Sequence, residues 1–264
     1  MRSAWIALAG AAFVATPGAA QIDYRNLDDD RPTTVEDAWT IERYAFEFLA
    51  PWRAERHDRV WVHSIIPELA YGVAPGVHVG LKLPLAWRPG QAYGDVGLSG
   101  VRAFGMMNIL NETSALPALA LRLDATAPVG GMGGDAVGLG VKGIATRSFG
   151  LNRLHANAGV AVVSPDQPAL VEALPRWFAG VAGDHTLLRS SMLLLGEVLV
   201  VEEAAEDPLE LRFTLGVRRQ VTPTLVLDAG FAQGWAEGVA PAYAFTAGLS
   251  HAFAWAALMP GGGR

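Results

Sequence analysis

Charged side chains stand singly within apolar stretches of this 264-residue chain, where they are best placed to do chemistry. Between Leu119 and Ala125, for example, Arg122 and Asp124 alternate with leucines. Successive side chains of a β-strand point to opposite faces, so these charges lie opposite the apolar face of their own strand. The pattern places nine charged residues on the polar faces of expected strands: Lys82, Arg122, Asp124, Lys142, Glu197, Glu210, Arg212, Arg218 and Asp228.

Charge at membrane depth is costly unless it is paired or wetted, so these nine residues predict a polar interior. In one interpretation they line a solute path and set its electrostatics and its choice of solute. In the other, the same charges form salt bridges and fill a closed, small barrel. The sequence leaves both interpretations open.

Histidine and serine would carry a different chemistry, that of an outer-membrane lipid hydrolase. Residues on one face of a strand are two positions apart. The pairs His63–Ser64 and Ser250–His251 are adjacent, so each pair points to opposite faces. The histidines also lack the usual metal-ligand spacing, and the chain has no cysteine. We therefore expect no enzyme activity, no catalytic residues, no metal site and no cofactor.

The glycine-rich stretch GGMGGDAVGLG is not expected to bind a nucleotide. A dinucleotide-binding loop needs the GxGxxG register, a strand before it and a helix after it. None of that context is present, so the stretch predicts a flexible connection between strands.

The composition and the first residues favour an exported membrane protein. Residues 1–20 combine Arg2, an apolar run and small residues before Gln21, which is typical of a cleaved secretory signal. Charged residues make up 17% of the chain, against about 25% in ordinary soluble domains. Beyond the signal we find no uncharged apolar run near the length of a membrane-spanning helix. The net charge of −6 argues against nucleic-acid binding.

High hydropathy without long apolar runs predicts that apolar residues are spread by alternation, as in membrane β-barrels. The last such segment, Ala242–Trp255, places large apolar side chains such as Phe245 and Phe253 opposite small ones such as Ala244 and Ser250. About twelve segments of this kind lie within residues 43–255. Ten residues at about 3.3 Å each, tilted by about 40°, rise roughly 25 Å, the height of an outer-membrane apolar band.

The remaining parts of the chain are expected to flank the barrel. Residues 21–42 predict a solvated arm on the periplasmic side, with a short helical turn capped by Thr34 and Asp37. Short connections such as VTP after Gln220 are expected on the periplasmic side, and longer ones such as SPDQPALVEAL outside. Residues 256–264 form a C-terminal tail. Six tryptophans near segment ends predict interfacial belts: Trp52, Trp61, Trp87, Trp177, Trp235 and Trp255.

Several of these segments together resemble a known family. The opening DDDRPTTVEDAWTIERYAFEF, the hairpin ELAYGVAPGVHVGLKLPL, and the stretches GDVGLSGVR and LGVRRQVTPTLVLDAGF are similar to the outer-membrane barrel family of phenol-degradation meta-pathway transporters. The resemblance covers nearly the whole mature chain. It implies a pore or uptake role for small molecules, aromatic or apolar compounds among them, and it carries over no catalytic residue. The tail after Trp255 departs from the usual end of such barrels.

We therefore predict an all-β protein: a transmembrane antiparallel up-and-down β-barrel of about 12 strands in the cell outer membrane of a Gram-negative-type envelope. The predicted function is a channel for passive passage of small molecules. The expected partners are outer-membrane lipid, a small-molecule solute and the barrel-assembly machinery, with no nucleic acid. Alternatives are a plugged structural or interaction barrel, an outer-membrane lipid-modifying enzyme, or a soluble periplasmic β-sandwich.

Overall fold

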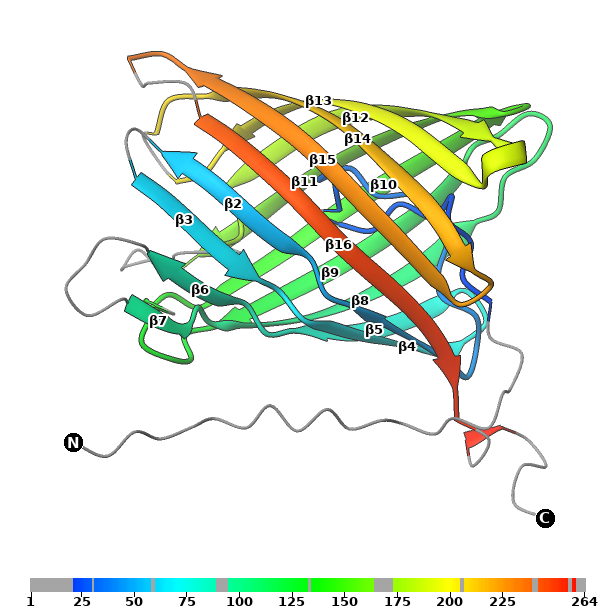
Figure 1. The fold of residues 1–264 in the computed structure, drawn as a ribbon, viewed down its shortest axis with the longest axis horizontal. Coiled ribbons are helices and arrows are strands. Elements are labelled where there is room, and N and C mark those ends of the chain that lie inside the picture. Colours follow the sequence, from blue (N-terminus) through cyan, green and yellow to red (C-terminus); the bar gives the residue numbers. More distant parts are fainter. Residues whose placement is uncertain are drawn as a thin grey trace.

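The protein is described by a computed structural model covering residues 21–29, 31–57, 60–88, 95–132, 134–163, 173–204, 207–238, 242–255 and 258–259. The predicted signal (residues 1–20), most of the connection SPDQPALVEAL (residues 164–172) and most of the tail lie outside these residues. Within the described part, the strands form one antiparallel sheet that closes where β1 (Ala45–Leu49) pairs with β16 (Ala242–Ala254). The result is a closed barrel (Figure 1), as predicted. No helix among these residues is long and apolar enough to cross a membrane.

Twelve strands make the wall, in agreement with the prediction. Four of these strands are each divided into two halves, and both halves of each pair with the same neighbouring strand of the barrel. The divided strands are β1 with β2 (Trp52–His57), β3 (Val60–Ile65) with β4 (Glu68–Ala74), β5 (Val77–Lys82) with β6 (Leu85–Arg88), and β7 (Asp95–Leu98) with β8 (Val101–Leu110). The other eight are continuous: β9 (Ala118–Ala127), β10 (Gly138–Phe149), β11 (Asn152–Val163), β12 (Trp177–Leu187), β13 (Met192–Glu202), β14 (Glu210–Thr222), β15 (Leu225–Ala236) and β16.

Proline explains three of the four interruptions. Pro51, Pro67 and Pro84 stand between the halves of three adjacent strands, and Gly100 stands in the fourth. Proline has no N–H, so it cannot donate to the ladder between strands. Its carbonyl still accepts, as in the bond from the Ile66 N–H to the Pro51 oxygen (3.0 Å). The sheet therefore stays continuous across the interruptions.

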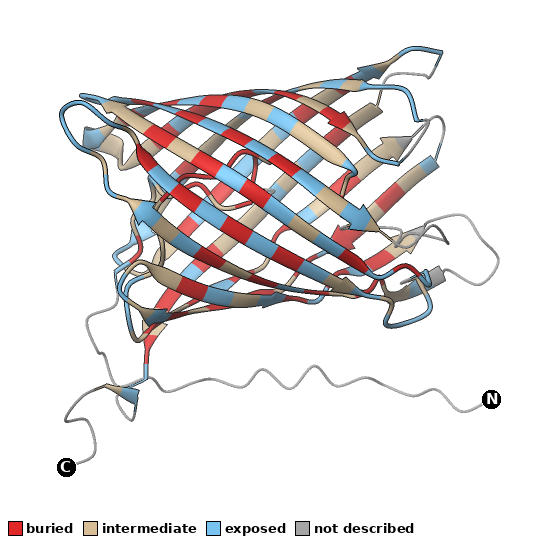
Figure 2. Ribbon diagram, turned by 180° about the vertical axis from the view of Figure 1, so that it is seen from behind, coloured by how far each residue is buried: buried red, intermediate tan, exposed pale blue. Residues whose placement is uncertain are grey.

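The alternation of side chains follows the prediction. Along β9, Leu121 and Leu123 are exposed on the outer surface, while Arg122 and Asp124 are buried inside. Figure 2 shows buried and exposed residues alternating along most strands of the wall. On β16, Phe245 faces outward and Ser250 inward, also as expected. The barrel therefore has an apolar outside and a polar or small-residue inside, as an outer-membrane barrel requires.

Aromatic rings gather at both ends of the wall near β16. Near its beginning, the His63 ring stacks on Trp87, with ring centroids 5.3 Å apart. Trp52 stacks on the same ring at 5.9 Å, but it pairs with Ala247 in the middle of β16 and so lies away from the end of the wall. Near its end, Phe46 lies 5.3 Å from Phe253. This arrangement matches interfacial aromatic belts.

The N-terminal segment, residues 21–44, does not form the predicted solvated arm. Figure 1 shows it, in dark blue, inside the barrel, and Val35 and Ala38 are fully buried. Leu27 packs against Leu193 of the wall. No helical turn forms around residue 34; instead, the Asp37 carboxylate accepts a bond from the Leu27 N–H (2.9 Å), which folds the segment back on itself. The prediction was wrong because it read the acidic run as solvated and did not weigh the apolar residues beside it.

The lipid-facing surface leads to a first testable expectation. Leu215 is 69% exposed near the middle of β14, and Val221 is 53% exposed near the end of that strand. Leu215→Arg should lower the free energy of folding into liposomes by about 2–4 kcal/mol, whereas Val221→Arg should cost about 0–1 kcal/mol, because the cost of an arginine falls away from the bilayer midplane. Denaturant titration in liposomes measures both values. Equal losses for the two variants would contradict a membrane-spanning β14.

Candidate functional site

A buried ionic network joins the N-terminal segment to the barrel wall, and Asp29 is its centre. The Asp29 carboxylate lies 2.8 Å from Lys142 Nζ, 3.0 Å from Lys82 Nζ, 3.3 Å from an Arg122 nitrogen and 3.4 Å from an Arg102 nitrogen. These four cations come from β10, β5, β9 and β8, which are consecutive strands of the wall. One carboxylate from the segment therefore draws together the cations of four strands.

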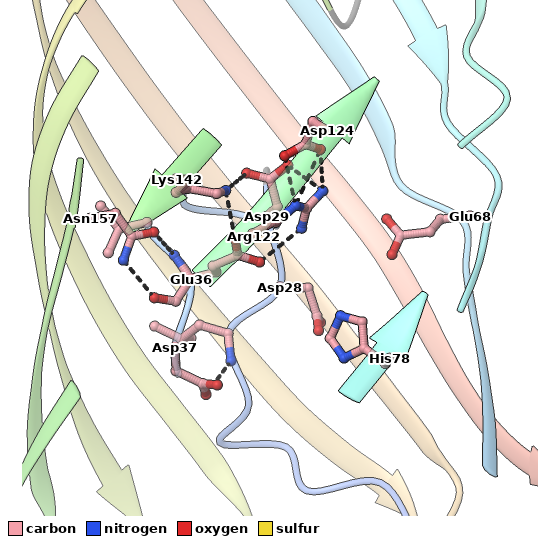
Figure 3. A network of polar contacts seen from close by, with 12 residues as sticks. Asp28, Asp29, Glu36, Asp37, Glu68, His78, Arg122, Asp124, Lys142 and Asn157 are labelled. Carbon is pink, nitrogen blue, oxygen red and sulfur yellow. Dashed lines mark hydrogen bonds and ion pairs between the residues drawn. The ribbon is translucent and has the colours of Figure 1, made fainter. Parts of the chain in front are cut away.

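Glu36 adds a second carboxylate to the same cations. Its carboxylate lies 2.6 Å from Lys142 Nζ and 2.9 Å from an Arg122 nitrogen. Its backbone N–H donates to Asn157 Oδ1 and its carbonyl accepts from Asn157 Nδ2, both at 2.9 Å. Asp124 holds the Arg122 guanidinium from the other side through two nitrogens (Figure 3). The segment is thus fixed through both its side chains and its backbone.

Burial acts in the same direction on two carboxylates of the segment, but the net shifts of their pKa values are opposite. Burial raises the pKa of Asp29, but the charges of Lys142, Lys82 and their neighbours outweigh it and hold that pKa well below its usual range. Burial raises the pKa of Asp37 to about 6, against the opposing charge of Arg153. Asp29 is therefore firmly ionised at neutral pH, while Asp37 titrates near it.

A second group of ion pairs holds the segment against β14 and β15. Arg31 of the segment pairs with Asp228, and Asp28 lies 2.9 Å from an Arg218 nitrogen. Arg31, Arg218 and Asp228 are all buried. The segment therefore presents cations to wall anions and anions to wall cations at different points of its path.

Two facing glycines make a recess for Pro32 between those pairs. Gly216 and Gly230 are directly paired across β14 and β15. A Cβ atom at either position would lie 2.2 or 2.3 Å from Pro32 atoms, far inside van der Waals contact. The room that these two glycines leave inside the barrel is filled by the chain's own segment.

Val35 of the segment is held on another side of the lumen by a hydrogen bond and by packing against a glycine. The Val35 N–H donates to Glu197 Oε2 (2.6 Å), and the Thr214 hydroxyl donates to the other oxygen of Glu197 (2.9 Å). The Val35 side chain reaches Gly180, where an added Cβ would lie 2.9 Å from Val35 Cγ2.

The side chains of Thr146, His155 and Asp184 form a hydrogen-bonded chain beside Ala38 of the segment. The Ala38 N–H donates to Thr146 Oγ1, which lies 2.9 Å from His155 Nδ1, and His155 Nε2 lies 2.9 Å from Asp184. Arg153 pairs with Asp184 and also lies 3.6 Å from Asp37. The fully buried Thr146 and His155 face the lumen and not the lipid, so this group serves as an anchor for the segment.

The two members of each adjacent His–Ser pair lie on opposite faces of the wall. His63 lies on the outer surface among tryptophans while Ser64 is buried. Ser250 is likewise buried and His251 exposed, as the spacing predicted. Among the residues that the structure describes, no group of three or more histidine, aspartate or glutamate side chains is arranged to hold a metal ion.

All nine sequence-predicted charges face the interior, but they do so in two groups. Glu210 and Arg212 pair with each other (2.8 Å) near the beginning of β14. The other seven contact the segment or one of its partners: Lys82, Arg122, Asp124, Lys142, Glu197, Arg218 and Asp228. Their position at the interior surface is as expected, while their role in a solute path stays a prediction.

Sequence reasoning missed Arg102 and the two segment carboxylates. Arg102 lies in VRAFGMMN, where Phe104 and Met106 share its inward face, so no apolar face marks the strand's orientation. A usable signal for Asp29 and Glu36 was complementarity: the segment is rich in acid, whereas the central wall strands carry an excess of lysine and arginine.

Two cavities lie beside the segment among the residues that the structure describes. A cavity of about 30 Å³ lies beside Asp29, Glu68 and Arg122, which is room for about two water molecules. A larger cavity of about 370 Å³ opens at the end of the barrel where the segment enters, lined by Gln21, Trp39 and other residues. The segment thus occupies the level of the network, while the mouth below it is open.

Comparisons with known proteins support the fold. No family model matches the chain, and no curated protein matches it in sequence, so the resemblance to the phenol-degradation family stays a prediction. Among solved structures, an outer membrane channel from Pseudomonas putida F1 is similar over 86% of this chain and 100% of its own, with a TM-score of 0.62 and 12% identity. The KdgM porin and the NanC porin each match 77% of this chain and 98% of their own, with TM-scores of 0.52 and identities of 9% and 8%. The chain therefore has the fold of outer-membrane porins and channels.

Proposed function

We propose that this protein is an outer-membrane channel for small molecules whose described state is closed by its own N-terminal segment. The observation that carries the proposal is the use of Asp29 and Glu36, two carboxylates of a non-strand segment, to neutralise cations of the wall. A barrel that only needed a filled interior could neutralise those cations with anions from its own strands. A separate segment is a part that can leave.

The proposal includes the location and the mode of transport. The apolar outer face and the two aromatic belts fit contact with outer-membrane lipid, after insertion by the barrel-assembly machinery. Passage through such a barrel is passive, along a gradient, and uses no cofactor. The similar structures are described as porins and a channel, which supports this role. The aromatic or apolar solutes that the family resemblance implies stay a prediction.

Release of the segment is energetically reachable despite its many ion pairs. Burying two charges costs hydration that their mutual attraction only roughly repays. If the segment leaves, both charges of each pair regain water. The free-energy cost is therefore far smaller than the cost of removing one charge from a pair within a dry interior. The described hydrogen bonds that join backbone to backbone between the segment and the rest of the barrel lie at its two ends, from the Ile22 N–H to the Pro223 carbonyl and from the Tyr44 N–H to the Gly72 carbonyl. Between these two ends, ion pairs and hydrogen bonds that involve side chains hold the segment to the wall.

A plugged structural or interaction barrel is the second candidate. The burial of Arg31, Arg218 and Lys82 favours it, because such a filled interior rigidifies a small barrel without transport. The two candidates differ in one property, which is whether the segment moves under native conditions.

A reversible covalent lock tests this property. The chain has no cysteine, so Val35→Cys with Gly180→Cys introduces the sole thiol pair. The 2.9 Å between the Gly180 Cβ position and Val35 Cγ2 is close to the separation between one Cβ and the other sulfur in a disulfide, about 3 Å. The oxidised mature chain in a planar bilayer should stay closed, and a reductant should restore conductance steps.

The single variant Val35→Cys is the control for the reductant, and it should conduct equally with and without it. If the oxidised and reduced double variants behave alike, the segment does not gate the barrel. The proposal would then give way to the plugged barrel.

A steric change at the Pro32 recess should act in the opposite direction. Gly216→Val places side-chain atoms where Pro32 packs, so it should displace the segment and raise the open fraction at least tenfold while leaving every charge in place. The matched control is Gly143→Val, where an added Cβ meets nothing nearer than 3.9 Å. Single-channel recording measures the open fraction. Equal open fractions in the two variants would show that the recess does not hold the gate closed.

A further inference from the structure

We infer that Lys82, Arg102, Arg122 and Lys142 form a binding site for small carboxylate solutes, and that such a solute opens the barrel by taking the place of Asp29 and Glu36. The inference rests on the proposed function, because it names the solute class of that channel. In the closed state, the two segment carboxylates stand in for the carboxylates of the solute.

Two carboxylates of the segment share the same cations. Lys142 Nζ lies 2.8 Å from Asp29 and 2.6 Å from Glu36, and Arg122 nitrogens lie 3.3 Å and 2.9 Å from the same two groups. A guanidinium and an ammonium placed this closely bind carboxylate oxygens well. The site therefore fits one molecule that carries two nearby carboxylates.

The wall carries more cations than anions in this region. The wall supplies two anions close to the four cations: Asp124 on Arg122, and Glu68 at 3.7 Å from Lys82. When Asp29 and Glu36 leave, the cations outnumber the anions in a lumen surrounded by lipid. A solute carboxylate restores the balance, whereas a neutral solute leaves like charges facing one another.

Aromatic faces lie beside two of the cations. The Arg122 guanidinium lies 4.0 Å from the centre of the Phe104 ring, and Lys142 Nζ lies 5.8 Å from that of Phe178. These rings offer apolar contact within the site for a solute that joins a ring to its carboxylates. Aromatic dicarboxylates are thus the class that matches both features.

The experiment uses phthalate, an aromatic dicarboxylate, and phthalamide, its neutral analogue. The mature Val35→Cys chain in detergent reports opening through labelling by a water-soluble maleimide, because Val35 is fully buried in the closed state. If phthalate binds the open state alone, a concentration ten times its Kd should raise the labelling rate about elevenfold. Phthalamide at equal concentration and ionic strength should have no effect.

Two further variants in the Val35→Cys background keep the test specific. Lys142→Gln should make the labelling rates with and without phthalate equal, whatever the basal rate of this variant, because Lys142 contacts both segment carboxylates. Lys142→Arg keeps the charge and should preserve the ratio. If Lys142 had only a structural role, Lys142→Gln would change the basal labelling rate, but phthalate would still raise that rate.

The outcomes separate the two proposals. Equal labelling with phthalate and phthalamide, alongside a working disulfide lock, would overturn the carboxylate site and leave the gated channel standing. A phthalate response that survives Lys142→Gln would also overturn the site. A failed disulfide lock would count against the gated channel itself.

Discussion

Neutralisation of charge inside the barrel is the constraint on which the rest of the structure depends. The wall of a membrane barrel is surrounded by hydrocarbon, so charges on its inner face must meet water or an opposite charge. Four consecutive strands bring Lys82, Arg102, Arg122 and Lys142 into one region of the lumen. Asp29 contacts all four. The position of the N-terminal segment follows from this need, because no other described carboxylate reaches all four cations.

The same constraint explains why the segment can be both firmly placed and removable. Packing of Val35 and Pro32 into recesses on the wall gives it one position, since a shift of either side chain would leave a void on one side and a clash on the other. Ion pairs add specificity more than net stability, because hydration competes with them once water enters. A segment held in this way has a defined closed state without a large free-energy cost of opening.

The strands of the wall keep their pairing despite the charges and the segment in the interior. Pro51, Pro67 and Pro84 interrupt three adjacent strands without changing the register between these strands, so the inward and outward faces stay the same on both halves of each. Outside, leucines and valines face lipid and aromatic rings gather near both ends of β16. Closure of the sheet satisfies the backbone of the wall, which leaves the interior side chains to position the segment.

Much of this architecture could be predicted from the sequence. A period of two, as in Leu119 to Ala125, decides which side chains face lipid, because strand geometry is local. It also placed all nine candidate charges inside. The partners of those charges could not be predicted in this way, since Asp29 lies 113 residues before Lys142 and meets it only once the barrel has closed around the segment. The sequence by itself determined the barrel and the polarity of its two faces, and only the tertiary structure decided that the acidic arm fills the lumen, because pairing of distant charges depends on where the closed wall brings them.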